Sequence, residues 1–191
     1  MRSTPAPPPL TCREVAEAER ALGISFPEEY RSYVLGVSAG GVLPRLEHTD
    51  QGWWWAGNRN RRRDLLATPF PHPASYAQAD AELSEREPRL EDFSDDLSYA
   101  AAWHAWDTEC EEFEDRKTAG AVIVQENGCG FSTLLVMTGP LAGTVWWDGR
   151  ATCDQIVSLS LHHGDSGRPA TLSEWIRHGS WDLLPPGWGS R

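Results

Sequence analysis

The sequence has little basic charge, no long apolar run and no closely spaced pair of cysteines. No stretch approaches the roughly 20 apolar residues of a membrane-spanning helix, so we expect no helical membrane span. The opening residues, MRSTPAPPPL, lack the apolar core of a secretion signal. Their prolines indicate a disordered or extended lead-in over residues 1–9, followed by a single domain over residues 10–191. We therefore expect a cytoplasmic protein.

The four cysteines Cys12, Cys110, Cys129 and Cys153 form no C-x-x-C motif. In a cytoplasmic chain such cysteines are expected to be reduced thiols, and free cysteine is often buried. We therefore expect reduced thiols, some of them in the core.

Acidic residues are concentrated in one segment. Residues 80–116 contain fourteen acidic and three basic side chains, a net charge of −11, while the remainder has fourteen of each. Such a segment repels nucleic acids and anionic membranes and attracts a basic protein. The alternative is a solvated face that only keeps the protein soluble. The arginine-rich run at residues 58–63 is expected to be an exposed loop, and it is too short to indicate nucleic-acid binding.

Two capping boxes predict a helix hairpin over residues 11–39. The first is Thr11-Cys12-Arg13-Glu14, and its helix should end at Gly23. The second is Ser25-Phe26-Pro27-Glu28, and its helix should end at Gly40-Gly41. Neither helix has a basic exposed face, so the pair is not expected to bind DNA.

The middle of the chain contains two aromatic features. Trp53-Trp54-Trp55 is expected to be a strand, with Trp54 on one face and its neighbours on the other. A helix is expected from Ser75 to about Glu87. Beyond it, large side chains spaced 4, 3, 4 and 3 residues apart predict an amphipathic helix: Tyr99, Trp103, Trp106, Cys110 and Phe113. This stripe is expected to be core, and the acidic residues lie mostly off it.

Short strands and glycine turns follow. Strands are expected over residues 121–125, 131–138 and 144–147 as an antiparallel meander, with a further strand over residues 156–161. A last helix is predicted by the capping box Thr171-Leu172-Ser173-Glu174.

The glycines at residues 128–143 do not form a phosphate loop. A P-loop requires G-x-x-x-x-G-K-[ST] between a strand and a helix, whereas here no lysine follows and a strand comes next. The dinucleotide pattern also fails, because the third glycine and the helix are missing. We expect these glycines to adopt positive φ in turns.

Three strings, LGISFPEEYRSYVLGVSAGG, NGCGFSTLLVMTGPLAGTVWWDG and ATLSEWIRHG, together resemble the motifs of the SUKH superfamily. The matching residues are Leu22, Gly23, Phe26, Pro27, Tyr30, Arg31, Leu35, Gly40, Gly41, Gly128, Gly130, Leu134, Gly139, Gly143, Val145 and Trp175. Residues 45–115 match poorly, apart from a faint likeness at residues 64–72.

The resemblance implies an α+β fold, with helices packed around a curved mixed, largely antiparallel β-sheet. Many bacterial members of this superfamily are immunity proteins that bind and block a polymorphic toxin. Other relatives are regulatory or scaffold proteins. The family has no common catalytic residues that could be carried over to this chain.

Possible catalytic groups are sparse. His162-His163-Gly164-Asp165 offers metal ligands or a base, but adjacent histidines on a strand point to opposite faces. Cys129 or Cys153 with His162 could form a thiol–imidazole pair. The carboxylates of residues 107–112 lack the pattern of a calcium loop. We therefore expect no catalytic residue, cofactor or metal, and keep a hydrolase using His162 or a cysteine as an alternative.

The sequence thus favours a non-enzymatic protein that binds another protein, such as a basic toxin domain, and neither nucleic acid nor a membrane. A regulatory or scaffold protein is the first alternative. An acidic patch can speed association, and aromatic side chains can serve as buried anchors. The candidate partner-binding residues are Trp53, Trp54, Trp55, Asp107, Glu109, Glu111, Glu112 and Asp115. No feature indicates an oligomeric state.

Overall fold

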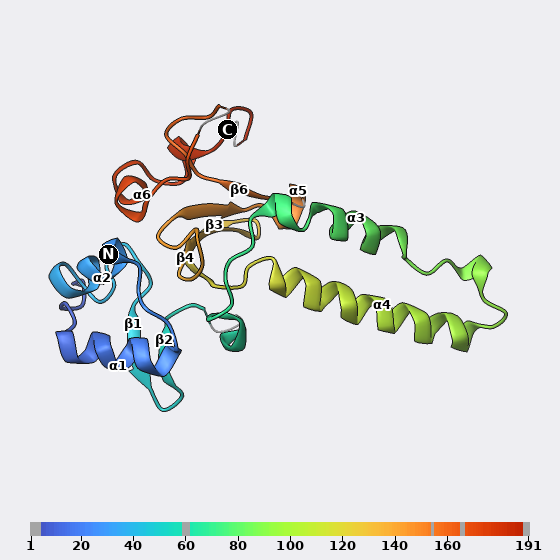
Figure 1. The fold of residues 1–191 in the computed structure, drawn as a ribbon, viewed down its shortest axis with the longest axis horizontal. Coiled ribbons are helices and arrows are strands. Elements are labelled where there is room, and N and C mark those ends of the chain that lie inside the picture. Colours follow the sequence, from blue (N-terminus) through green and yellow to red (C-terminus); the bar gives the residue numbers. More distant parts are fainter. Residues whose placement is uncertain (1–4, 59–61, 154, 165–166, 189–191) are drawn as a thin grey trace. The chain divides into compact units, whose positions relative to one another are not determined.

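The computed structural model describes residues 5–58, 62–153, 155–164 and 167–188, and it separates the chain into two units. Unit 1 is formed by residues 1–70 and 120–191, and unit 2 by residues 71–119. Helices accompany a two-stranded and a four-stranded antiparallel sheet, and neither sheet closes into a barrel (Figure 1). The predicted α+β class is confirmed. The expected mixed character is not seen, because every pairing between the described strands is antiparallel.

Helix α1 (Cys12–Leu22) begins and ends as its sequence predicts. The hydroxyl of Thr11 accepts a hydrogen bond from the Glu14 amide, and the Glu14 carboxylate accepts one from the Thr11 amide. These two bonds satisfy amides that have no partner within the helix. Gly23 ends the helix with φ 69°.

Helix α2 (Glu28–Gly36) departs from the prediction at both ends. Ser25 does not cap it; Pro27 precedes the first helical residue and gives no side-chain cap. A residue before proline is disfavoured in the helical region, so Phe26 cannot begin a helix. Instead, the Phe26 amide donates to the carboxylate of Glu19. The helix also ends at Gly36, before the glycine pair that was expected to stop it.

The lead-in is attached to the end of α2. Ser38 Oγ donates to the carbonyl of Pro7, the Ala39 amide donates to Pro8, and the Leu10 amide donates to Val34. Residues 1–4 lie outside the described residues.

Strands β1 (Leu46–Thr49) and β2 (Gly52–Trp55) form a hairpin. Glu47 pairs with Trp54, and Leu46 with Trp55. The predicted alternation is not seen, because Trp54 and Trp55 are both buried in the same apolar cluster, with ring centroids 5.4 Å apart.

The second sheet is a meander in the order β3-β4-β5-β6. Its strands are β3 (Ala121–Gly128), β4 (Phe131–Val136), β5 (Val145–Asp148) and β6 (Ile156–Ser158). The predicted meander is confirmed, although β6 is shorter than expected. Both faces of this sheet are buried: Val122, Leu135 and Trp147 belong to one apolar cluster, and Leu134 and Trp146 to another.

The glycine turn between β3 and β4 bends the backbone. Gly128, Cys129 and Gly130 all have positive φ, as predicted for the two glycines. At Gly130 a side chain would also collide with Ala151, since an added Cβ would lie 2.6 Å from the Cβ of that residue.

The rest of unit 1 is helical or irregular. It contains the 3-10 turns η1 (Arg63–Leu65) and η4 (Trp181–Leu183) and the helices α5 (Arg150–Cys153) and α6 (Leu172–His178). The predicted capping box between Thr171 and Glu174 is present, and Gly179 follows the helix.

Unit 2 contains two 3-10 turns and two helices, which are η2 (Pro73–Ser75), α3 (Ala77–Glu85), η3 (Leu90–Asp92) and α4 (Asp96–Arg116). The helices α3 and α4 run side by side in opposite directions (Figure 1). Ser75 lies in η2 and does not cap α3, so the expected helix starts two residues later. Asp95 caps α4 by accepting a hydrogen bond from the Ser98 amide.

Candidate functional site

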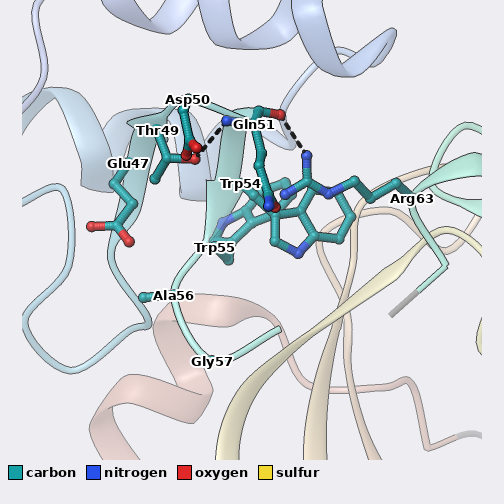
Figure 2. A pocket seen from close by; sticks show the side chains of 9 residues that line it. All are labelled: Glu47, Thr49, Asp50, Gln51, Trp54, Trp55, Ala56, Gly57 and Arg63. Atoms are coloured by element: carbon teal, nitrogen blue, oxygen red, sulfur yellow. Dashed lines mark hydrogen bonds between the residues drawn. The ribbon is translucent and has the colours of Figure 1, made fainter. Parts of the chain in front are cut away.

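A pocket of about 420 Å³ opens beside the β1–β2 hairpin, and we call it the tryptophan pocket. Two indoles form part of its wall, and three charged side chains surround them. Its lining residues are Glu47, Thr49, Asp50, Gln51, Trp54, Trp55, Ala56, Gly57 and Arg63. Figure 2 shows Glu47 and Asp50 on one side of the indoles and Arg63 on the other.

The indoles of this pocket are held rigidly. Trp54 and Trp55 are only 6% and 2% exposed, and their rings meet edge to face. The Trp54 indole N–H donates to the carbonyl of Asn58, and that of Trp55 donates to the hydroxyl of Tyr30. Both indole donors are thus satisfied inside the protein, as buried polar groups need to be.

This burial corrects part of the predicted partner-binding surface. Trp54 and Trp55 are core residues, so neither offers a protruding anchor to another protein. Trp53 is half-buried, and its ring packs edge to face against His48 at 5.3 Å. The strand was predicted correctly. The pairing of β2 with β1 and the cover given by Asn58 and Arg63 were not visible in the sequence.

Asn58 also corrects the expected exposed loop over residues 58–63. Its side chain is buried, donates to the carbonyl of Ile123 and accepts from the Ile123 amide. Residues 59–61 lie outside the described residues, and Arg62 and Arg63 are exposed.

The guanidinium of Arg63 lies over one indole of the pocket. Its central carbon is 4.7 Å from the ring centroid of Trp54, within the range of a cation–π contact. Its Nη1 donates to the carbonyl of Gln51 at 2.8 Å. The pocket therefore already has a cationic group from its own chain against an aromatic wall.

The second candidate site is the outer face of α4 in unit 2. Unit 2 has fourteen acidic and four basic residues, a net charge of −10 out of −11 for the whole chain. Asp107, Glu109, Glu111, Glu112 and Asp115 are all exposed. Among the described residues, Asp107, Glu111 and Glu112 form no ion pair.

Glu109 differs from these carboxylates because it holds the two helices together. Its two oxygens accept hydrogen bonds from Nη1 and Nη2 of Arg86 at 3.0 and 2.7 Å. This bidentate pair lowers the pKa of Glu109 and raises that of Arg86. Glu109 therefore contributes to the packing of α3 against α4 in unit 2.

The aromatic stripe of α4 is less buried than expected. Tyr99, Trp103, Trp106 and Phe113 are all half-buried, and α4 has no buried residue. Trp106 donates from its indole nitrogen to the carbonyl of Leu83 on α3. The spacing predicted the helix correctly, but the stripe is not a fully enclosed core.

Lys117 follows α4 and is buried beside acidic and aromatic side chains. Its ammonium group is 2.8 Å from a carboxylate oxygen of Asp80, bonds to Glu114 and lies over the rings of Tyr76 and Phe113. The attraction between these groups offsets the cost of burying the charge. This cluster connects the beginning of α3 to the end of α4.

The cysteines and histidines do not assemble as the alternative hypothesis requires. Cys12, Cys129 and Cys153 are exposed and Cys110 is half-buried, so the expected buried thiols are not found. Burial and nearby carboxylates raise the pKa of Cys110, which keeps that thiol protonated. His162 and His163 lie in an exposed loop beyond the end of β6. In the parts of the chain that the structure describes, no hydrogen bond joins a cysteine to a histidine.

The remaining features concern metals and membranes. Among the described residues, no three histidine, cysteine or acidic side chains are grouped to hold a metal ion. Asp165, from the predicted His-His-Gly-Asp run, lies outside those residues. Within the same ranges, no helix combines the length and apolar character needed to cross a bilayer.

No family model, curated protein or solved structure matches the chain. We therefore infer its function from the charge, burial and contacts of its own residues.

Proposed function

We propose that this protein is a non-enzymatic, cytoplasmic binding protein of the immunity type, which binds and blocks a basic toxin domain through the outer face of α4. The charge of unit 2 is the observation that carries the proposal. With a net charge of −10 in 49 residues, unit 2 attracts a basic surface over a distance of about one Debye length, ~8 Å at physiological salt.

The exposed carboxylates of α4 support this role. Asp107, Glu111 and Glu112 are exposed and form no ion pair within the described chain, so a basic partner can reach them. Toxins that cut nucleic acid commonly have basic grooves, because such grooves bind phosphates. A row of carboxylates can occupy such a groove and keep the substrate out.

The division of the chain is consistent with the same proposal. The matching residues of the resemblance to the SUKH superfamily lie in unit 1, whereas most of unit 2 falls within the stretch that resembles it poorly, residues 45–115. In this proposal unit 1 is the common scaffold, and unit 2 carries the contacts specific to one partner.

The experiment uses the product of the gene adjacent to this one as the toxin candidate. Toxicity is measured with and without the full chain, and association of the two purified proteins is measured at 50 and 300 mM NaCl. We expect the full chain to restore growth, and the association rate to fall at least tenfold at the higher salt concentration. Growth that is not restored, or an absence of binding, would refute the immunity role.

A charge-reversal variant locates the contact. D107K, E111K and E112K together should slow association at least tenfold and leave the thermal unfolding midpoint of the protein nearly unchanged. The matched control reverses three exposed carboxylates of unit 1, Glu17, Glu126 and Asp182, which alters net charge equally. Equal effects of the two variants would mean that overall charge, not the face of α4, drives binding.

A further inference from the structure

The tryptophan pocket has the chemistry of a site for a cationic group. Its walls include the indoles of Trp54 and Trp55, and the electron-rich face of Trp54 already attracts a cationic group of the chain, that of Arg63. Among the described residues, its lining carries the carboxylates of Glu47 and Asp50 and one cationic side chain, that of Arg63. The described lining residues therefore sum to a net charge of −1, which favours a cationic ligand over an anionic one.

The carboxylates are available to a ligand to different degrees. Asp50 is exposed at the turn of the hairpin and forms no ion pair among the described residues. Glu47 lies 3.7 Å from Arg45 in an exposed pair, and such pairs contribute little. A ligand cation can therefore use both carboxylates without breaking a buried interaction.

Arg63 indicates which cation suits the pocket. Its guanidinium already lies on the Trp54 ring, held there by one hydrogen bond to a backbone carbonyl. Since Arg63 is exposed, it can move into solvent at small cost when another group takes its place. Planar guanidinium stacks well on indole, and it forms paired hydrogen bonds with carboxylates.

We propose that the tryptophan pocket binds a guanidinium group and that Arg63 occupies the Trp54 ring in the absence of that ligand. The volume of about 420 Å³ is sufficient for a guanidinium and its alkyl chain, and falls in the range of small-ligand sites. The ligand stacks on Trp54 and pairs with Asp50 and Glu47, while Arg63 is displaced. The pocket lies wholly in unit 1, so this inference is independent of the proposed role of α4.

The test titrates the full chain with three probes at constant ionic strength. They are the tripeptide N-acetyl-Gly-Arg-Gly-amide, the same peptide with neutral citrulline in place of arginine, and agmatine. Binding is followed by the NMR signal of the Trp54 indole N–H, assigned with W54F. We expect the arginine peptide to bind at least tenfold more tightly than the citrulline peptide. Agmatine binding more tightly than the peptide would indicate a free small molecule as ligand, and the reverse order an arginine side chain.

Two variants distinguish this site from a non-specific acidic surface. R63Q frees the Trp54 ring from its internal competitor and should tighten binding of the arginine peptide about three- to tenfold. The control R20Q changes net charge equally at an exposed position outside the pocket lining. D50N should weaken binding at least threefold.

The proposal is overturned if the two peptides bind alike, or if none of the probes shifts the Trp54 signal at 50 mM. It is also overturned if R63Q binds no more tightly than R20Q, because Arg63 would then not be a competitor. Tighter binding of N-acetyl-Gly-Asp-Gly-amide than of the arginine peptide would show that Arg63 recruits anions instead.

Discussion

The indole nitrogen of Trp55 donates a hydrogen bond to the hydroxyl oxygen of Tyr30 over 2.6 Å, and both side chains are almost fully buried. The bond connects β2 with α2 through two residues that are 25 positions apart in the sequence. Phe26 packs edge to face against both rings, at 5.1 and 6.0 Å. Burial raises the pKa of Tyr30 well above its usual value, so its hydroxyl stays neutral.

The first prediction concerns this bond. Y30F leaves the buried Trp55 N–H without an acceptor, and we expect a loss of about 1–3 kcal/mol in the free energy of unfolding. Urea unfolding followed by circular dichroism measures the loss. Y33F is the control: its hydroxyl bonds the carbonyl of Gly40, but Tyr33 is half-buried and water can replace it. Equal losses in the two variants would contradict the argument from burial.

The second prediction separates backbone strain from collision at two glycines. Gly120 and Gly128 have φ of 66° and 81°. A Cβ at Gly120 would lie 2.3 Å from Thr138 Oγ1 and 2.4 Å from the Thr68 carbonyl oxygen, whereas one at Gly128 would meet nothing within 4 Å. G128A should cost about 1–2 kcal/mol from strain alone. G120A should destabilise the protein clearly more than G128A, which melting temperatures of the two variants measure. Similar melting temperatures would contradict the predicted collision at Gly120.

The third prediction tests two similar sequence motifs that differ in structure. T11A removes the side-chain acceptor of the Glu14 amide and should destabilise the protein by about 1 kcal/mol. S25A should change the free energy of unfolding by only about a few tenths of a kcal/mol, since Ser25 does not cap α2. Chemical denaturation of both variants provides the comparison. A loss in S25A as large as in T11A would indicate that Ser25 does cap the helix.

The fourth prediction concerns stability in acid. Hydrogen bonds from Arg168 and from the Thr171 amide lower the pKa of Glu174 to about 2 in the folded protein. Because this folded-state pKa lies below the usual value of 4.5, the ionised form contributes stability above about pH 4.5, and the contribution is lost as pH falls toward 2. Solvent screening at the exposed Arg168 limits the contribution to about 1–2 kcal/mol.

E174Q tests this pH dependence. The variant should be less stable than the native protein at pH 7, and the difference should shrink as pH is lowered from 5 toward 2.5. Urea midpoints at several pH values measure it. The control is E17Q, whose carboxylate pairs with Arg13 at 3.8 Å on the surface and should contribute little at any pH. A stability difference between E174Q and the native protein that stays constant with pH would show that Glu174 acts through the geometry of its hydrogen bonds and not through its charge.

Local signals account for the parts of the fold that were predicted well. Thr11 with Glu14, and Thr171 with Glu174, bond to each other across three residues, so the chain needs no distant contact to form these caps. The 4-3-4-3 spacing from Tyr99 to Phe113 predicted α4 for the same reason. The prediction that Ser25 caps α2 was wrong, because the proline two residues later prevents the helix from starting there. This reason is also visible in the neighbouring sequence.

The candidate sites were predicted less completely. The acidic side chains of α4 named above are exposed, as expected. The ion pair between Glu109 and Arg86 was not predicted, because these residues are 23 positions apart and meet only when α3 lies beside α4. The tryptophan run was expected to provide anchors, yet Trp54 and Trp55 became pocket walls. Arg63 lies against Trp54 although the two are nine residues apart, and no periodic pattern connects them.

The amino-acid sequence by itself determined where most helices and strands form and where the negative charge is concentrated, because caps, turns and periodicity depend on neighbours within a few residues. Tertiary structure alone decided which polar and aromatic side chains are buried together. Asn58 illustrates the reason: its side chain satisfies both backbone groups of Ile123, 65 residues further along the chain. A contact between residues so far apart in the sequence forms only when the core has brought the β1–β2 hairpin and the four-stranded sheet together.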